Sequence, residues 1–537
     1  MNPIHHGHRR PSRLRTACLA LATAALCAPL LLTAAGGPSA AEEGVDAPAT
    51  AAAPAPRLHL SAPKRQVVYA EGKRLYTDLG VRMVAQGADL RLDLNRADYS
   101  SPIVVSRRDA AGGSTELGTD LTNSFNQLDR FVRLRFTPLK TSPKAKASYT
   151  RVRGACLGSV SERIRPDADP RSPYPTYCNY NPYSLGAVQG ISDGYAASVL
   201  EPWGRMKGVP KGRYRVEVRV TKAWADALNM SATDRVRTTT VRIRSYEDCD
   251  RGCRRSVPRP PSDTPTPSAS RPNAQRALDP AEVPADYPKP DLRALPAWGL
   301  QISGNGNYLQ FSATVWNGGN SPLVVDGFRR GGKDLMDGYQ YFFDADGQQL
   351  PDYARVGEFE WDPKPTHLHW HFRSFAAYSL LPVGHTPEAP DGHDDHHGVQ
   401  SRKEAFCLAN TDAVDLTGDG AQWNVENSDL ATACGDHTSL SIREVLAAGW
   451  GDTYAQFRAG QSFNLKGLPN GCYNVWVEGN PILDHETGDR TLVESDYSNN
   501  TAKRRVCIGG KPGARKIRHL QQIGDVDEND RGEYYRR

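Results

Sequence analysis

The chain has 537 residues, 39% of them hydrophobic and 24% charged, so its length allows two to four domains that each bury a core. Lys and Arg total 66 and Asp and Glu total 61, a formal net charge of +5. Four arginines and no acid precede residue 42, so the rest of the chain carries 5 − 4 = +1. This near-neutral balance argues against a polybasic nucleic-acid or membrane-surface binder. Ten cysteines and many Gly/Pro turns argue against a helical bundle or a cytosolic Rossmann enzyme.

The N-terminus has the three parts of a secretory signal. Four arginines within residues 9–15 are followed by an uncharged, apolar run from Ala17 to Ala35 and by small residues up to Ala41. This order predicts a signal peptide over residues 1–41 and a secreted, extracellular mature chain. An uncleaved membrane anchor is the alternative.

Eight cysteines remain after the signal, four before residue 255 and four after residue 400. An even number in an exported chain predicts up to four disulfides. About 105 connectivities are possible; we favour Cys407–Cys434 and Cys472–Cys507. A zinc site is not favoured, because the sequence has no C-x-x-C pair.

Composition then divides the mature chain into segments. Alternating apolar and polar residues, as in Tyr214–Val220, are typical of half-buried antiparallel strands. We therefore predict an all-β fold with few short helices, built from two tandem β-sandwich-like domains joined by a Pro/Ser-rich linker. The predicted segments are a disordered Ala/Pro-rich stretch (42–57), an N-terminal β-rich domain (58–253), the linker (254–288), a second domain (289–510) and a charged, disordered tail (511–537).

The two domains have a similar turn and strand near their ends. Residues 208–214 read GVPKGRY and residues 467–473 read GLPNGCY, each followed by a predicted strand. This pattern favours a duplication, although Pro-x-Gly-x-Tyr is also ordinary turn chemistry. Residues 58–250 contain no His-x-His-x-His, so the first domain is predicted to be a degenerate, non-catalytic copy.

The sharpest chemical feature is the motif THLHWHF at residues 366–372. In a strand, alternate side chains share a face, so His367, His369 and His371 are expected to project together. Leu368 and the aromatic residues would then face the buried side. Three neutral imidazoles on one face suit a copper or zinc site with open positions.

Four motifs in order resemble the catalytic domain of the lysyl oxidase family over about residues 290–508. They are the histidine triplet, KEAFCL at 403–408, DTY at 452–454 and ESDYSNN at 494–500. The resemblance implies that His367, His369 and His371 bind copper. It further implies that Lys403 and Tyr454 cross-link into lysine tyrosylquinone, the cofactor that accepts electrons from the amine.

The last motif has its own interpretation, because Glu494, Asp496, Asn499 and Asn500 form an oxygen-rich set appropriate to Ca²⁺. The resemblance implies that these residues bind calcium together with Asp291 and the backbone carbonyl of Leu292. An Asx-rich turn without a metal is the alternative.

These expectations predict a copper- and quinone-dependent amine oxidase that converts primary amines or peptidyl lysine to aldehydes with O₂, releasing hydrogen peroxide and ammonia. Asp452 is the predicted general base, with His437 as a weaker candidate. A mononuclear copper or non-haem iron oxygenase, and a non-enzymatic metal-binding cell-surface protein, are the alternatives. No nucleic-acid partner is expected, and no membrane partner after signal cleavage; the natural substrate and the oligomeric state stay open.

Overall fold

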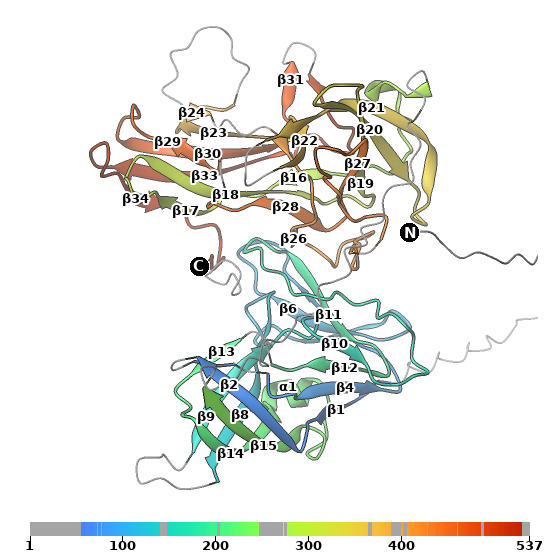
Figure 1. Cartoon of the computed structure of the whole chain (residues 1–537), viewed down its shortest axis with the longest axis vertical. Coiled ribbons are helices and arrows are strands. Elements are labelled where there is room, and N and C mark those ends of the chain that lie inside the picture. Colours follow the sequence, from blue (N-terminus) through green and yellow to red (C-terminus); the bar gives the residue numbers. More distant parts are fainter. Residues whose placement is uncertain are drawn as a thin grey trace, which may run out of the picture. The chain divides into compact units, whose positions relative to one another are not determined.

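The computed structural model describes residues 55–71, 74–76, 78–139, 148–200, 204–245, 272, 276–363, 368–387, 399–400, 405–426, 428–458, 460–484 and 488–528. These residues are almost entirely strands, turns and loops, which confirms the predicted all-β class (Figure 1). The helices among them are α1 (Lys222–Ala227) and the 3₁₀ helix η2 (Pro280–Glu282).

The strands of the N-terminal half form three sheets around one hydrophobic cluster. The first sheet has the order β1 (Arg57–Ser61), β4 (Arg82–Gln86), β12 (Tyr195–Ser198) and β10 (Ser161–Arg163). The second has the order β11 (Gly186–Ile191), β5 (Leu90–Asn95), β6 (Val104–Arg108) and β7 (Ser114–Gly118). The third has the order β13 (Arg205–Lys207), β3 (Arg74–Tyr76), β2 (Arg65–Glu71), β15 (Val236–Ser245), β14 (Gly212–Val220), β8 (Leu128–Pro138) and β9 (Tyr149–Ala155).

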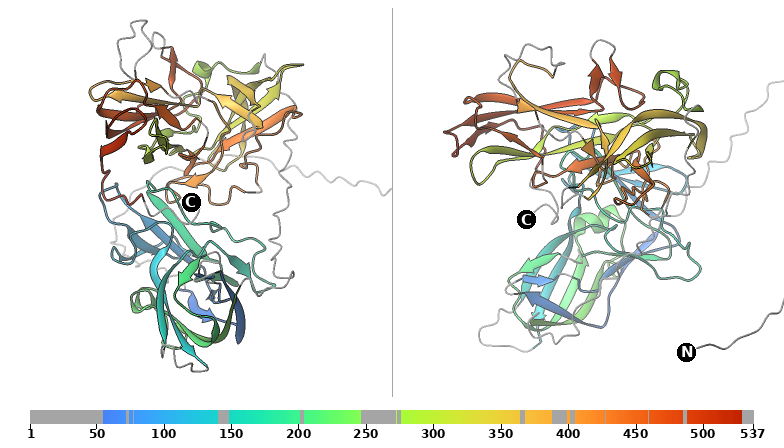
Figure 2. Two further views of the ribbon diagram at one scale, coloured as in Figure 1. Left: turned by 60° about the vertical axis from the view of Figure 1, so that its left-hand side comes forward. Right: turned by 45° about the horizontal axis from the view of Figure 1, so that its top comes forward.

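The C-terminal half is built from three larger sheets and a hairpin, coloured yellow-green to red in Figure 2. One sheet has the order β16 (Leu292–Ala294), β18 (Tyr308–Asn317), β28 (Trp450–Tyr454) and β26 (Asp412–Ala413), and β17 (Trp298–Ile302) and β29 (Ser462–Asn464) also pair with β18. A six-stranded sheet has the order β25 (Ala405–Phe406), β22 (His369–Arg373), β21 (Gln349–Asp362), β20 (Leu335–Phe343), β19 (Leu323–Arg329) and β27 (Ser441–Leu446). A five-stranded sheet has the order β24 (Val399–Gln400), β23 (Ala376–Pro382), β30 (Gly471–Gly479), β33 (Thr501–Gly509) and β34 (Lys516–Leu520), and β31 (Ile482–Asp484) pairs with β32 (Asp489–Arg490).

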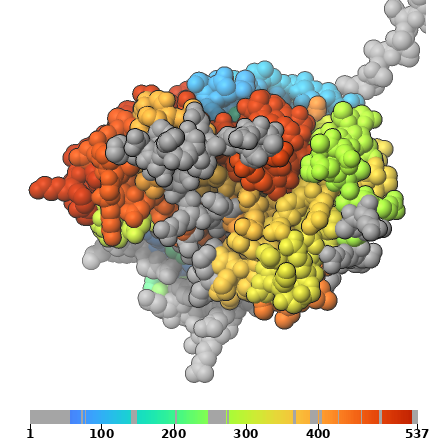
Figure 3. Space-filling view, turned by 90° about the horizontal axis from the view of Figure 1, so that it is seen from above, coloured from blue at the N-terminus to red at the C-terminus, as the bar shows by residue number. Residues whose placement is uncertain are grey.

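The core of this half joins side chains from all three large sheets. Phe311 of β18, Phe372 of β22 and Val475 of β30 are fully buried in one cluster. Phe359 of β21 meets Phe372 edge-to-face, with ring centroids 5.0 Å apart. The strand with the predicted copper ligands is therefore held in place by close packing against its buried face. Figure 3 views the face of the molecule on which yellow-to-red residues of this half predominate.

The two similar turns adopt the same local structure. The Tyr214 hydroxyl donates to the Pro210 carbonyl at 2.8 Å, and the Tyr473 hydroxyl donates to the Pro469 carbonyl at 2.7 Å. Each tyrosine lies in a nine-residue strand, β14 or β30, whose first residue is a glycine. The match supports a common origin, while the division into two related domains stays a prediction.

Both favoured disulfides are confirmed. Cys407 is bonded to Cys434, and Cys472 is bonded to Cys507 across the paired strands β30 and β33. A third bond joins Cys156 to Cys178. Cys249 and Cys253 lie outside the described residues.

Ordered structure continues beyond both predicted ends of the second domain. The tail expected to be disordered from residue 511 adds strand β34 to β33, and its Val526 is buried. Glu528 also pairs with Arg504, whose buried guanidinium needs an anionic partner. At the other end, the predicted linker contains η2 and the buried Val283. The sequence did not reveal that these two segments are ordered, because both are mostly polar. Only a few buried residues in each segment contact the rest of the domain.

Candidate active site

The predicted copper strand is β22. His369 and His371 lie two residues apart on it, so they share a face, and their ring centroids are 4.7 Å apart. Trp370 and Phe372, on the opposite face, are fully buried as expected. His367 lies outside the described residues.

The expected strand does not include Leu368. Its φ of 51° is in the left-handed region, and its side chain is 53% exposed rather than buried. The Leu368 N–H donates to the Asp362 carbonyl at 3.1 Å. The alternation that predicted a burial site for Leu368 therefore begins only at His369, where the register with β21 begins.

A buried carboxylate lies beside one of the histidines. Asp362 Oδ2 lies 3.6 Å from His371 Nδ1, and both side chains are buried. A carboxylate beside one ring nitrogen is the usual outer partner of a metal-bound histidine, because it leaves the other nitrogen for the metal. His369 and His371 therefore fit a metal through two neighbouring imidazoles, with Nε2 of His371 as the ligand atom.

The predicted quinone tyrosine ends strand β28 and reaches a different sheet. The Tyr454 hydroxyl accepts a hydrogen bond from the Cys407 N–H at 3.1 Å and donates to the Cys407 carbonyl at 3.3 Å. Its ring meets Phe406 edge-to-face, with centroids 4.8 Å apart. Burial, followed by the charges of Asp452 and Glu444, raises the pKa of Tyr454 well above its ordinary value.

The same segment also contacts the histidine strand. In β25, Phe406 pairs with Phe372 and Ala405 pairs with Arg373. Lys403 precedes Ala405 by two residues and lies outside the described residues. The fold thus brings β22, β25 and Tyr454 together, although they are separated by up to 85 residues of sequence (454 − 369).

Two buried acids lie beside this tyrosine. Asp452 is 3% exposed and, as the residue two before Tyr454 on β28, points to the same side of its sheet. Glu444 of β27 is fully buried; its Oε2 accepts a hydrogen bond from the Leu408 N–H, and its Oε1 has no hydrogen-bond partner in the described part of the chain. Burial, followed by the charge of Asp452, raises the pKa of Glu444 well above its ordinary value.

Sequence analysis missed Glu444. The sequence does hold one sign of its position. Glu444 lies midway between Ile442 and Leu446, so in a strand its side chain points to the same buried side as theirs. Glu444 also lies near the sulfurs of Cys407 and Cys434, with ligand atoms of all three within 4.8 Å. The two sulfurs share a disulfide and offer no thiolate, so this group is not a thiolate metal site.

The weaker base candidate, His437, lies on the surface. It is 55% exposed, its Nε2 is 2.9 Å from Asp334 Oδ1, and its ring centroid is 4.9 Å from that of Trp361. The structure thus gives it a surface ion pair rather than a place among the buried acids beside Tyr454.

All six predicted calcium residues come together where the start of β16 meets the loop before β33. Glu494 Oε2 accepts from the Leu292 N–H at 2.7 Å, and Glu494 Oε1 accepts from Asn500 Nδ2 at 2.7 Å. Asn499 Nδ2 donates to Asp291 Oδ1 at 2.9 Å and to Asp496 Oδ2 at 3.0 Å.

The donor set at this place fits a hard cation. The Oδ1 atoms of Asn499 and Asn500 are buried and have no hydrogen-bond partner among the described residues. Two orphaned amide oxygens beside three carboxylates are the chemistry that Ca²⁺ selects. Burial raises the pKa of Glu494 to about 7 despite three hydrogen bonds that lower it, and a bound cation would favour its charged form.

Comparisons with known proteins add no assignment: no protein-family model matches the chain, and neither does any curated protein. None of the described helices is long and apolar enough to cross a membrane.

Proposed function

We propose that this chain is a secreted, copper- and quinone-dependent amine oxidase of the lysyl oxidase type. The observation that carries the proposal is the convergence of its motifs. The Tyr454 hydroxyl is bound to the Cys407 backbone, four residues after Lys403, in a segment that pairs with the histidine strand. If Tyr454 were only a core residue, nothing would require the histidine strand and the segment after Lys403 to lie beside it.

His369 and His371 would hold the copper ion, with His367 as the third imidazole. When present, copper and dioxygen supply the oxidation that turns the Tyr454 ring into a quinone joined to Lys403, and this quinone accepts the electrons of the amine. The overall reaction converts a primary amine, O₂ and water to an aldehyde, ammonia and hydrogen peroxide.

Protein groups beside Tyr454 would handle the proton. Asp452 is the proposed base for the substrate α-proton. It lies two residues before Tyr454 on β28, so the two side chains are on the same side of the sheet. Burial raises the pKa of Glu444, which favours its protonated form relative to that of an exposed acid, and we assign Glu444 no role as the base.

Phe406 and the Cys407 backbone would fix the orientation of the Tyr454 ring through one edge-to-face contact and two hydrogen bonds. Calcium would act at a separate place. By binding Asp291 before β16 and Glu494 before β33, it would tie the first strand of this half to a late one.

The test is amine-dependent peroxide formation by copper-loaded protein carrying Tyr454→Phe, with Tyr308→Phe as a matched loss of one hydroxyl. We expect Tyr454→Phe to abolish the activity and Tyr308→Phe to retain it. Activity that survives in Tyr454→Phe would favour a mononuclear oxygenase using the same histidines. No amine-dependent peroxide from wild type at any copper loading would favour a non-enzymatic metal-binding protein.

A further inference from the structure

The seven-stranded sheet of the N-terminal half has a strongly basic outer face. On strand β14, Tyr214, Val216 and Val218 are buried in the core, so the alternate residues face solvent. The same alternation holds on β2, β15 and the part of β8 that pairs with β14. We call the following set the arginine face: Arg65, Arg133, Arg135, Lys211, Arg213, Arg215, Arg219, Arg242 and Arg244.

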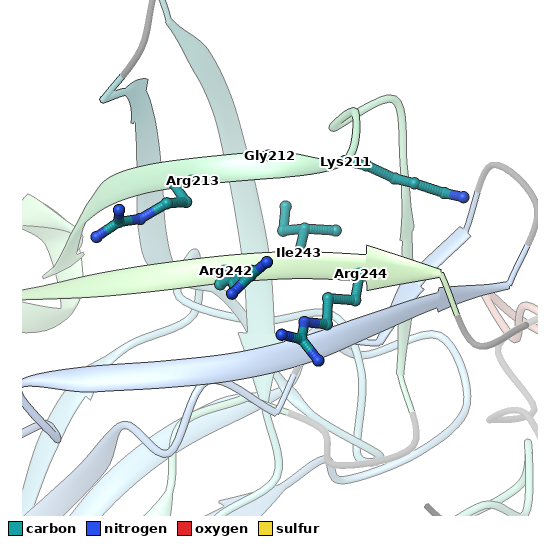
Figure 4. A pocket seen from close by; sticks show the side chains of 6 residues that line it. All are labelled: Lys211, Gly212, Arg213, Arg242, Ile243 and Arg244. Carbon is teal, nitrogen blue, oxygen red and sulfur yellow. The ribbon is translucent and has the colours of Figure 1, made fainter. Parts of the chain in front are cut away.

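Strand register places these side chains side by side. Arg213 lies directly opposite Arg242, and Arg219 lies directly opposite Arg133. Directly paired residues share a face with their Cβ atoms about 5 Å apart. Lys211, Arg213, Arg242 and Arg244 line a pocket of about 440 Å³ between the start of β14 and the end of β15 (Figure 4).

Negative charge on this face is scarce. Among the described side chains of the arginine face, the acidic one is Glu217. Arg219 already contacts Glu217 at 3.3 Å. Arg213, Arg215, Arg242 and Arg244 have no carboxylate partner within the described ranges. Like charges directly opposite each other destabilise a sheet, so the opposed pair Arg213 and Arg242, which has no carboxylate partner among the described residues, favours the binding of an anion.

We propose that the arginine face binds a linear polymer that carries an anionic phosphate group in each repeat and no nucleobase. Eight of its nine cations are arginines, whose planar fork matches phosphate oxygens with two hydrogen bonds. Successive outward residues along a strand repeat at about 7 Å and neighbouring strands at about 5 Å. This lattice of cations extends across four strands, and so suits a chain of phosphates rather than a single ion.

Other polyanions fit the face less well. The described aromatic side chains on this side of the sheet are Tyr69 and Tyr76, and Arg205 already stacks on the Tyr76 ring, whereas single-stranded nucleic acids bind to several free stacking aromatics. The large exposed apolar residues on or next to it are Val67 and Leu139, too few for insertion into a lipid surface. No described helix projects from the face, as reading a DNA groove usually requires.

The nearly zero net charge of the mature chain conceals this face. The acids that balance its nine cations lie elsewhere in the sequence, and only strand register collects the arginines on one side. The net-charge argument, which was made against nucleic-acid and membrane-surface binding, therefore does not exclude a phosphate polymer on this surface.

The test measures binding of the full-length mature protein to long-chain inorganic polyphosphate at several salt concentrations. The variant is Arg213→Thr with Arg242→Thr, since threonine suits an exposed strand position. The control is Lys516→Thr with Arg518→Thr, which removes the same charge from exposed residues of β34.

We expect the logarithm of the wild-type binding constant to fall linearly with the logarithm of salt concentration. The variant should reduce that slope by about 1.4, at about 0.7 per lost phosphate contact, and bind about tenfold more weakly. The control should match wild type. A lysine pair, Arg213→Lys with Arg242→Lys, should keep the slope but bind more weakly, because the fork is lost.

Equal losses in the variant and the control would overturn the proposal, as would no binding by wild type. Tighter binding at equal charge to single-stranded DNA, duplex DNA, heparin or anionic vesicles would assign the face to that partner instead. Amine-dependent peroxide formation should be unchanged in the variant, so this test is independent of the proposed oxidase.

Discussion

Glu494→Gln tests the proposed calcium site most quantitatively. The Glu494 carboxylate is 4% exposed and accepts three hydrogen bonds. The donors are the Leu292 N–H to Oε2, and Asn480 Nδ2 and Asn500 Nδ2 to Oε1, each at 2.7 Å. A glutamine of the same shape can place its single carbonyl oxygen on only one of these two sides.

Either orientation therefore leaves at least one buried donor facing the new NH₂ group. With its oxygen toward Asn480 and Asn500, the glutamine loses the bond from Leu292. One unsatisfied buried donor costs about 1–3 kcal/mol, so Glu494→Gln should lower the unfolding free energy by about 2 kcal/mol in chelator.

Calcium should add a second difference. Sites of extracellular type have dissociation constants of about 10⁻⁴–10⁻³ M, so 10 mM Ca²⁺ should stabilise wild type by about 1.4–2.7 kcal/mol. Glu494→Gln should lose most of this gain. The matched variant Asp496→Asn also loses a hydrogen bond, but at an exposed side chain, so it should lose less stability in chelator than Glu494→Gln and should lose part of the calcium effect.

Urea denaturation with and without calcium measures both differences. Wild-type stability that does not respond to calcium, together with unchanged stability of Glu494→Gln in chelator, would refute the reasoning for both the metal and the hydrogen bonds. A calcium response retained in Glu494→Gln would place the ion elsewhere.

Three further predictions follow from single groups. Asp452→Asn should lower the rate of amine oxidation by about 10²–10⁴-fold, whereas Glu444→Gln, which mimics a protonated acid, should keep most of the wild-type rate. Steady-state peroxide assays measure both rates, and equal losses would contradict the assignment of Asp452 as the base. Burial raises the pKa of Glu478 to about 7, so its protonated form stabilises the fold below its unfolded pKa of about 4.5, and this contribution is lost as pH rises to about 7. Glu478→Gln should therefore reduce the fall in unfolding free energy between pH 5 and 8, by up to about 3 kcal/mol, and an unchanged pH slope would count against it. Tyr473→Phe should cost about 1 kcal/mol in urea denaturation, through loss of the hydrogen bond to Pro469, and a neutral effect would remove that bond's assigned role.

Sequence periodicity predicted the strands well where one face of a sheet is buried. Trp370 and Phe372 are buried and His369 and His371 share the other face, because alternation is a direct consequence of strand geometry. Alternation fails at Leu368, whose backbone is in the left-handed region just before β22 begins, a conformation that no glycine signals in the sequence.

Motif order picked out six residues that the fold does bring together, and their binding of calcium stays a prediction. Glu444 and Asp362 could not be found in this way. Their roles depend on long-range register, Glu444 facing the Leu408 N–H and Asp362 facing His371 across a hairpin. The tail after residue 511 was missed because its polar strand is held by pairing with β33 rather than by its own apolar residues.

The proposed amine oxidation requires that Tyr454 and Lys403 form a quinone cofactor. The most direct measurement is peptide mass spectrometry of digested, copper-loaded, secreted protein, with Tyr454→Phe as the control. We expect one cross-linked species that joins the peptides containing Lys403 and Tyr454, with a mass shifted for quinone formation, in wild type and none in the variant. Copper-bound wild-type protein in which both peptides are free and unmodified would contradict it.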